Sequence, residues 1–204
     1  MIDPANITNF DRTKAELEEF LLFGLCVAGK KATVQAEKLE RFLHALDKIW
    51  QGQDPNIKNY IGPKNHVVLS PFELLSNSRE ADVLECMKTV GLGQYRKLLQ
   101  GFEDARHLDV FNCTLEDLEK CYGVGPKTSR FFLLHSRPNQ NLACLDTHVL
   151  KYLKSEGFPA PKVNPSKKLY PLLEKAFLFL ARENNMTPAN FDLNIWNHKG
   201  KFVP

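Results

Sequence analysis

The segment 122–126, YGVGP, places two glycines and a proline between two stretches whose apolar residues recur at helical spacing. No regular α-helix continues through such a segment, because proline lacks the amide hydrogen and glycine loses the most conformational freedom on folding. Residues 114–136 therefore predict a helix, a tight glycine hairpin and a second helix that begins close to Lys127. We expect Gly123 and Gly125 to adopt backbone angles closed to other residues and to let a ligand approach the backbone.

The same helical spacing runs through most of the chain. Thr13 and Glu16 have the spacing of a capping box, and Ser70 followed by Pro71 marks another helix start. No convincing alternation of apolar and polar residues predicts a strand. The sequence therefore predicts an all-α fold, with helices in the ranges 13–29, 34–50, 70–77, 79–90, 93–105, 114–121, 127–136, 147–157 and 168–184.

Composition limits the class of protein. The 204 residues suffice for one large domain or two small ones. The five cysteines are scattered and include no Cys-x-x-Cys pair, which argues against a zinc knuckle or a cysteine-ligated iron–sulfur cluster and is typical of a reducing compartment. The first residues lack the pattern of a signal peptide, and the longest apolar run is too short to cross a bilayer. We expect an intracellular protein of the cytoplasm or nucleoid, or of the nucleus in a eukaryote, without a membrane partner.

Positive charge is concentrated in residues 120–168. This segment holds nine Lys and Arg residues and two acids, for a net charge of +7, whereas the whole chain carries +3. Such asymmetry indicates a surface that faces a polyanion. A solvated lysine-rich face is the alternative.

The predicted hairpin has the geometry of a phosphate site. The amides at the start of a helix are unpaired, and the helix dipole places its positive end behind them. The residues expected to contact a phosphate here are Gly123, Val124, Gly125 and Thr128. An ordinary αα-hairpin without a ligand is the alternative.

A second chemical group follows the hairpin. Asp146 stands nineteen residues after Lys127, immediately before another helical pattern. Aspartate at this position commonly caps the helix, and a cap also holds its carboxylate rigidly in place.

Two segments together resemble the helix-hairpin-helix DNA glycosylases, the superfamily of endonuclease III and the 8-oxoguanine glycosylases. These segments are YGVGPKTSRFFLLH and LACLDTHVLKYL. Their pattern is a Leu-Pro-Gly-Val-Gly-x-Lys hairpin followed by Val-Asp-x-His. TVGLGQYRKLLQGFEDA is similar to the helix that precedes the hairpin, and LLFGLCVAGKKATVQAEKLERFL is similar to the helix-loop-helix that wedges a residue into the duplex. Cys121-Tyr122 replaces Leu-Pro. Because the chain shows neither the cysteine cluster nor an N-terminal β-domain, it is most similar to the short archaeal and bacterial 8-oxoguanine glycosylases.

The resemblance implies two helical lobes with the active site in the cleft between them. Residues 31–136 would form a helical barrel that ends in the hairpin, and residues 1–30 plus 137–204 would form the second lobe. Lys127 would be the nucleophile at C1′ of the sugar, where a helix N-terminus and partial burial disfavour a charged amine. Asp146 would stabilise the cationic sugar and steer proton transfers.

Other positions follow from the resemblance with open alternatives. His148 would contact a phosphate or lie on a helix surface, and Lys30 and Lys31 lie near the wedge position but also suit phosphate contacts or solvent. Trp196 and Lys199 would line the base pocket, unless the aromatic C-terminus simply packs between helices. No cofactor is implied. A monovalent cation could bind the hairpin carbonyls of Glu119, Cys121 and Val124.

These features predict a monomeric, bifunctional DNA glycosylase/AP lyase of base excision repair. It would act on double-stranded DNA that contains a damaged base or an abasic site, through a lysine Schiff base and β-elimination, with 8-oxoguanine as the favoured base. The alternatives are oxidised or modified pyrimidines as substrates, and a non-catalytic helix-hairpin-helix DNA-binding module. The last explains the glycines and the basic segment but not Lys127 together with Asp146.

Overall fold

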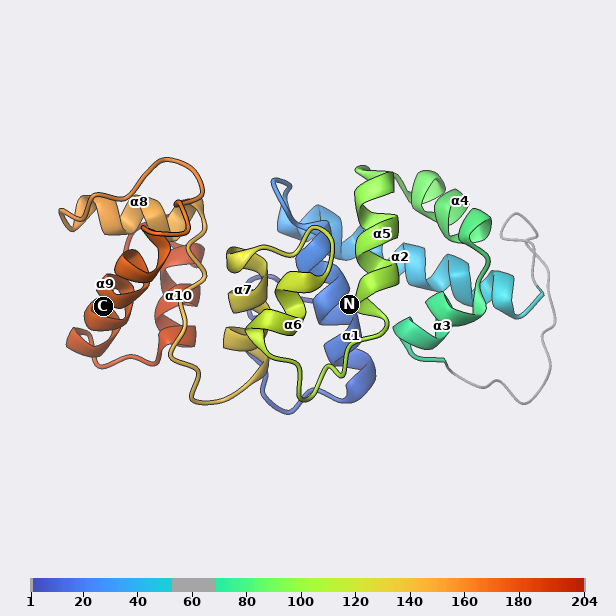
Figure 1. Ribbon diagram of the computed structural model, residues 1–204, viewed down its shortest axis with the longest axis horizontal. Coiled ribbons are helices and arrows are strands. Elements are labelled where there is room, and N and C mark those ends of the chain that lie inside the picture. Colours follow the sequence, from blue (N-terminus) through green and yellow to red (C-terminus); the bar gives the residue numbers. More distant parts are fainter. Residues whose placement is uncertain (1, 53–68, 204) are drawn as a thin grey trace. The chain divides into compact units, whose positions relative to one another are not determined.

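The computed structural model describes residues 2–52 and 69–203 (Figure 1). Within these ranges the chain forms ten α-helices and no strand, which confirms the predicted all-α class. The helices are α1 (Lys14–Cys26), α2 (Ala32–Trp50), α3 (Pro71–Asn77), α4 (Glu80–Val90), α5 (Tyr95–Ala105), α6 (Leu115–Lys120), α7 (Pro126–Ser136), α8 (Thr147–Ser155), α9 (Tyr170–Glu183) and α10 (Pro188–Asn197).

Side-chain caps fix several of the helix starts. Thr13, Ser70 and Thr114 each accept a hydrogen bond from the third residue of their helix, whose carboxylate accepts one in return from the capping residue's amide. These reciprocal bonds satisfy amides that the helix leaves unpaired. The capping boxes of α1 and α3 confirm the start signals read from the sequence. The tenth helix, α10, lies beyond the predicted ranges, although Thr187 and Pro188 form the same kind of start signal.

The chain divides into two compact units. Unit 1 comprises Met1–Pro4 and Arg12–Val124, and unit 2 comprises Ala5–Asp11 and Gly125–Pro204. These bounds differ from the expected domains, because α1 belongs to unit 1 and α7 to unit 2. The two predicted domains, 31–136 and 1–30 plus 137–204, and the cleft between them stay predictions.

Helix α1 is the centre of unit 1. Its residues from Phe20 to Cys26 are all buried, and it contacts α2, α3 and α5. Glu18 is completely buried on this helix and accepts a hydrogen bond of 2.9 Å from the amide of Phe72, at the start of α3. Phe42 of α2 and Phe102 of α5 pack with ring centroids 5.7 Å apart. The unit is therefore built around a helix that is apolar on nearly every side.

Unit 2 has its own apolar core. Helices α8, α9 and α10 pack against one another (Figure 1), with Phe177 and Phe191 fully buried between them. Phe191 and Phe202 lie 5.1 Å apart and pack into this core. Trp196 is not among the residues of this core, and its place in a base pocket stays a prediction. The core supports the start of α8, where Asp146 lies.

All five cysteines are free and buried. No helix in the described part of the chain combines the length and the apolar character needed to cross a membrane.

Candidate active site

The hairpin turns at Gly123, which has a φ of +83°. This left-handed conformation favours glycine, as predicted. The amide of Val124 donates to the carbonyl of Cys121 at 3.1 Å, and the amide of Tyr122 donates to Asp104 Oδ2 at 2.7 Å. Asp104 of α5 thereby holds the first half of the hairpin within unit 1. Val124 is buried and its amide is paired within the hairpin, so its contact with DNA stays a prediction.

Gly125 corrects one expectation. It has a φ of −114° and a ψ of −178°, an extended conformation that any residue adopts. A Cβ built at Gly125 would meet no atom within 4 Å. The glycine is therefore not required by the turn, and its missing side chain leaves the backbone at the start of α7 open to a ligand.

Helix α7 begins without a side-chain cap. Gly125 is its N-cap residue, Pro126 is the first helical residue, and the first intrahelical hydrogen bond is donated by Ser129. Within the described residues, the amides of Lys127 and Thr128 have no acceptor. Thr128 is buried, and its contact with a phosphate stays a prediction. This helix start has the properties of an anion site.

Lys127 lies at this helix start, and its side chain is partly buried. Within the described part of the chain, its amine makes no hydrogen bond and no ion pair. Asp146, in the same unit, is close enough for the charge of Lys127 to lower the pKa of its carboxyl group. The structure therefore brings together the two residues that the sequence predicts to be catalytic.

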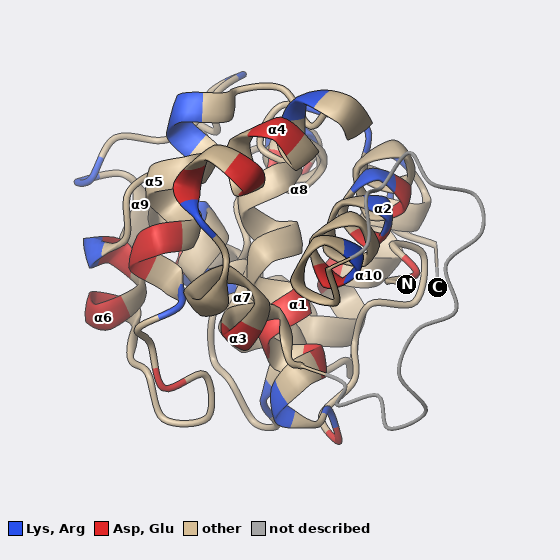
Figure 2. Cartoon of the chain, turned by 90° about the vertical axis from the view of Figure 1, so that its right-hand side faces the viewer, with Lys and Arg blue, Asp and Glu red and all other residues tan. Residues whose placement is uncertain are grey.

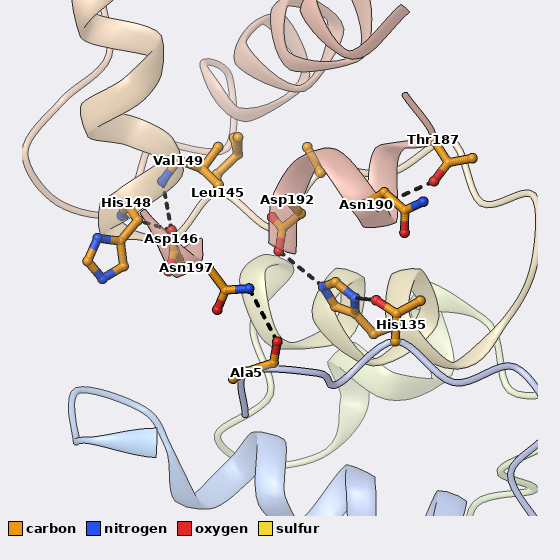
Figure 3. A network of polar contacts seen from close by, with 12 residues as sticks. Ala5, His135, Leu145, Asp146, His148, Val149, Thr187, Asn190, Asp192 and Asn197 are labelled. Carbon is orange, nitrogen blue, oxygen red and sulfur yellow. Dashed lines mark hydrogen bonds and ion pairs between the residues drawn. The ribbon is translucent and has the colours of Figure 1, made fainter. Parts of the chain in front are cut away.

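Asp146 is the N-cap of α8, as predicted. Its Oδ1 accepts hydrogen bonds of 2.8 Å from the amides of both His148 and Val149 (Figure 3). Its Oδ2 receives no hydrogen bond from the described residues. One oxygen thus fixes the carboxylate on the helix, while the other remains available to a substrate.

A buried polar network lies next to Asp146. His135 of α7 is fully buried; its Nε2 lies 3.0 Å from Asp192 Oδ2, and its Nδ1 lies 2.8 Å from Thr8 Oγ1 (Figure 3). Oδ1 of Asp192 is buried and has no hydrogen-bond partner among the described residues. His135 and Asp192 are 57 residues apart and were not predicted as site residues from the sequence. The one signal was a histidine on the apolar side of a helix.

Two further predicted residues lie together in unit 2. The His148 ring packs edge-on against Trp196, with the centroids 6.4 Å apart. Lys199 is exposed, has a φ of +55°, and accepts a hydrogen bond of 3.3 Å from Lys151 through its carbonyl. The base pocket stays a prediction, as do the phosphate contact of His148 and the cation on the carbonyls of Glu119, Cys121 and Val124.

The two lysines predicted to lie near the wedge position differ from each other. The Lys30 amine donates to the carbonyl of Leu92, whereas Lys31 is exposed at the start of α2. Burial lowers the pKa of Lys30, and the charges of Lys38 and Lys97 lower it further. Lys97, which sequence analysis did not single out, packs on the hairpin: a Cβ at Gly123 would lie 2.7 Å from its Cε.

Lys38 and Lys97 lie close enough to Lys30 for their charges to act on it. Acidic residues lie in the first turns of α4 and α6 of the same unit, where Figure 2 shows red segments. The wedge and DNA-binding roles of Lys30 and Lys31 stay predictions.

The hairpin depends on a small residue in α5. A Cβ at Gly101 would lie 2.7 Å from the carbonyl oxygen of Tyr122 and 3.2 Å from Leu25 Cδ2. We expect Gly101→Ala to destabilise the protein by about 1–2 kcal/mol, because the clash exceeds the gain of about 1 kcal/mol in helix propensity. Thermal unfolding measures this change. The control is Gly125→Ala, which should keep the wild-type melting temperature and weaken binding to duplex DNA. Equal melting temperatures for all three proteins would contradict this account of the hairpin.

The pKa of Asp146 leads to a second prediction. Burial raises this pKa and the carboxylate of Asp192 raises it further, while the Val149 amide, His148 and Lys127 act in the opposite direction. If the ionised carboxylate is the active form, the rate rises with pH through this elevated pKa. Removing the Asp192 charge by Asp192→Asn should shift the acidic limb of the pH–rate profile to lower pH. Single-turnover base release as a function of pH measures this shift.

Glu156→Gln, at the other end of α8, removes a charge that does not act on Asp146 and should leave the limb in place. An unshifted limb in Asp192→Asn would contradict the assignment.

The pH dependence of stability has the opposite sign to that of activity. Because the folded state holds the Asp146 proton more tightly than the unfolded state, this group contributes stability at acidic pH that is lost as pH rises through its folded pKa.

No protein-family model matches the sequence. The 8-oxoguanine DNA glycosylase/AP lyase of Picrophilus torridus is 34% identical over 79 residues, which are 39% of this chain and 37% of that protein. A protein of the same name from Thermotoga sp. strain RQ2 is 33% identical over 103 residues, 50% of this chain and 49% of that protein. The chain thus spans about half or less of the length of these curated relatives.

Two solved structures share the fold. The crystal structure of Methanocaldococcus jannaschii 8-oxoguanine DNA glycosylase has a TM-score of 0.64 at 19% identity, covering 98% of this chain and 86% of that chain. The structure of the same enzyme with a 15mer DNA containing 8-oxoguanine has a TM-score of 0.64 at 18% identity, covering 95% and 86%. The predicted resemblance to the short 8-oxoguanine DNA glycosylases is thereby confirmed, as a shared fold and a partial sequence similarity.

Proposed function

We propose that this protein is a bifunctional DNA glycosylase/AP lyase that removes an oxidised base from duplex DNA. The proposal rests on the environment of Lys127. Its amine is unpaired among the described residues, it stands at a helix start with open amides, and its charge acts on the carboxylate of Asp146. The similarity to proteins named 8-oxoguanine DNA glycosylase/AP lyase supports it.

The open amides of Lys127 and Thr128 suit a phosphate of the DNA backbone, which they would bind without reading the sequence. A base stacked inside a duplex is out of reach of any side chain. The nucleotide must therefore be turned out of the helix, at a cost of a few kcal/mol. The grip on the phosphate would hold the strand while the sugar comes to the amine.

The chemistry needs one nucleophile and one carboxylate. The neutral amine of Lys127 forms a bond to C1′ as the bond from C1′ to the base breaks, and the base leaves with the electron pair and takes up a proton. Opening of the sugar ring gives an imine between C1′ and Lys127. Removal of a proton from C2′ then expels the 3′ phosphate and cuts the strand.

Asp146 would act on the charge that develops in this reaction. The sugar becomes cationic as the base departs, and a fixed carboxylate in a partly buried site stabilises that charge more than water does. The cap bonds from His148 and Val149 to Oδ1 keep Oδ2 in place without reorganisation. Oδ2 is therefore the atom proposed to face the sugar.

The base that we propose is 8-oxoguanine, on the strength of the relatives' names and of the C-terminal aromatic residue Trp196. A planar side chain can stack on a purine. The test is a panel of duplexes with identical flanks, each containing one lesion, scored for base release by the purified protein. Preferential release of 8-oxoguanine opposite cytosine is expected. Preferential release of thymine glycol or 5-hydroxyuracil would replace this substrate with oxidised pyrimidines.

A further inference from the structure

Tyr170, the first residue of α9, connects the two segments that carry Lys127 and Asp146. Its single hydroxyl proton is shared between two acceptors, the carbonyl oxygen of Ala143 at 2.9 Å and that of Pro126 at 3.4 Å. The hydroxyl oxygen accepts a hydrogen bond of 3.2 Å from the amide of Leu145. Pro126 directly precedes Lys127, and Leu145 directly precedes Asp146. The Tyr170 hydroxyl thus contacts the backbone of the residue that directly precedes each of the two proposed catalytic residues.

A second pair of side chains makes the same connection. Glu174, one turn further along α9, accepts a hydrogen bond of 2.8 Å from Arg130 Nε and one of 3.0 Å from the amide of Ala143. Arg130 also donates to the carbonyl of Pro126 at 3.3 Å. Its guanidinium lies over the ring of Tyr170, 4.6 Å from the centroid. Helix α9 therefore contacts both segments twice, through Tyr170 and, one turn later, through Glu174 with its partner Arg130.

The connection is buried. Tyr170 is 5% exposed, and Ala143 and Leu145 are 0% exposed. The side chains of Arg130 and Glu174 are each 14% exposed. Burial also raises the pKa of the Tyr170 hydroxyl, so this group keeps its proton and remains a donor. Hydrogen bonds in such a setting are strong, and leaving one partner unpaired is costly.

We propose that Tyr170 is a positioning residue that fixes the distance between the Lys127 amine and the Asp146 carboxylate by joining the backbone on either side of them. The proposal rests on the proposed function and adds to it a residue that never touches the DNA. Helix α9 supplies no chemical group to the reaction. It acts as the frame on which the nucleophile and the carboxylate are aligned.

The expected consequence is a loss of rate without a loss of binding. Small displacements of reacting groups cost large factors in rate, because the reaction requires the amine and the carboxylate to act on the same sugar. The phosphate site uses backbone amides of α7 that do not contact Tyr170. Tyr170→Phe removes only the hydroxyl and keeps the ring under Arg130. It should therefore slow imine formation by about tenfold to a hundredfold.

The experiment compares three proteins: the wild type, Tyr170→Phe and Tyr152→Phe. Tyr152 is a matched control because it is also 5% exposed in the core of unit 2, and its hydroxyl has no hydrogen bond to the described residues. Each protein is mixed in excess with duplex DNA carrying an abasic site, and borohydride reduces the imine to a covalent complex whose rate of formation is recorded. Affinity for DNA with a tetrahydrofuran abasic analogue and the melting temperature are measured in parallel.

Tyr170→Phe should be trapped slowly, with wild-type affinity, and Tyr152→Phe should match the wild type in both. Hydrogen exchange at the Leu145 amide should become faster in Tyr170→Phe alone, since that amide loses its acceptor. A wild-type trapping rate in Tyr170→Phe overturns the inference about Tyr170. A parallel loss of rate and affinity also overturns it, because Tyr170 would then be merely structural. Absence of trapping in the wild type overturns the proposed function instead, and with it any role of Tyr170 in that reaction.

Discussion

Lys127→Gln is expected to abolish strand cleavage at abasic sites and covalent trapping by borohydride, with a loss of about 10³-fold or more in rate. The amide of glutamine cannot form an imine with C1′. Binding to abasic-site DNA should survive, because the phosphate site consists of backbone amides that the substitution leaves in place. Single-turnover cleavage of end-labelled DNA and a binding titration measure the two effects separately.

Lys154→Gln is the matched control for this substitution. Lys154 is exposed on α8 in the same unit, so the variant loses the same charge without touching the proposed site. It should cleave at the wild-type rate. If Lys127→Gln cleaves abasic DNA as fast as the wild type, another group performs the chemistry.

Asp146→Asn is expected to slow base excision by about 10²- to 10³-fold while the fold is kept. Asparagine caps a helix as well as aspartate does, so the amides of His148 and Val149 retain their acceptor. The variant loses only the negative charge near the sugar. Base release from a lesion-containing duplex and thermal unfolding are the two measurements.

Asp146→Ala separates the cap from the charge. It loses both, so its stability should fall by about 0.5–2 kcal/mol while its excision rate should match that of Asp146→Asn. The opposite pattern, with a slow Ala variant and an unimpaired Asn variant, would reduce Asp146 to a structural cap.

Much of the fold could be predicted from the sequence because its signals are local. The capping boxes at Thr13 and Ser70, the proline at position 71 and the helical spacing of the apolar residues act within a few residues of one another. Helix α10 lies outside the predicted ranges, although Thr187 and Pro188 carry the same start signal. The division into compact units depends on packing between distant helices, and the domain bounds read from the sequence stay a prediction.

The site was predicted in part for the same reason. Lys127, Asp146 and the turn at Gly123 belong to motifs that are contiguous in the chain. His135, Asp192 and Tyr170 do not, because each acquires its role only when another helix is folded against it. The contact of Lys30 with the carbonyl of Leu92 also joins residues far apart in the chain, so no local motif predicts it, and the wedge role of Lys30 stays a prediction. Gly125 lies in the hairpin as expected, but its missing side chain leaves open space and its backbone angle is an ordinary one.

The central claim is that Lys127 is the nucleophile of a DNA glycosylase/AP lyase. The most direct test is to incubate the wild-type protein with abasic-site duplex DNA and borohydride, digest the covalent complex and locate the nucleotide adduct by mass spectrometry. One adduct is expected, on the peptide that contains Lys127. No covalent complex, or an adduct on another lysine or on the terminal amine, would contradict it.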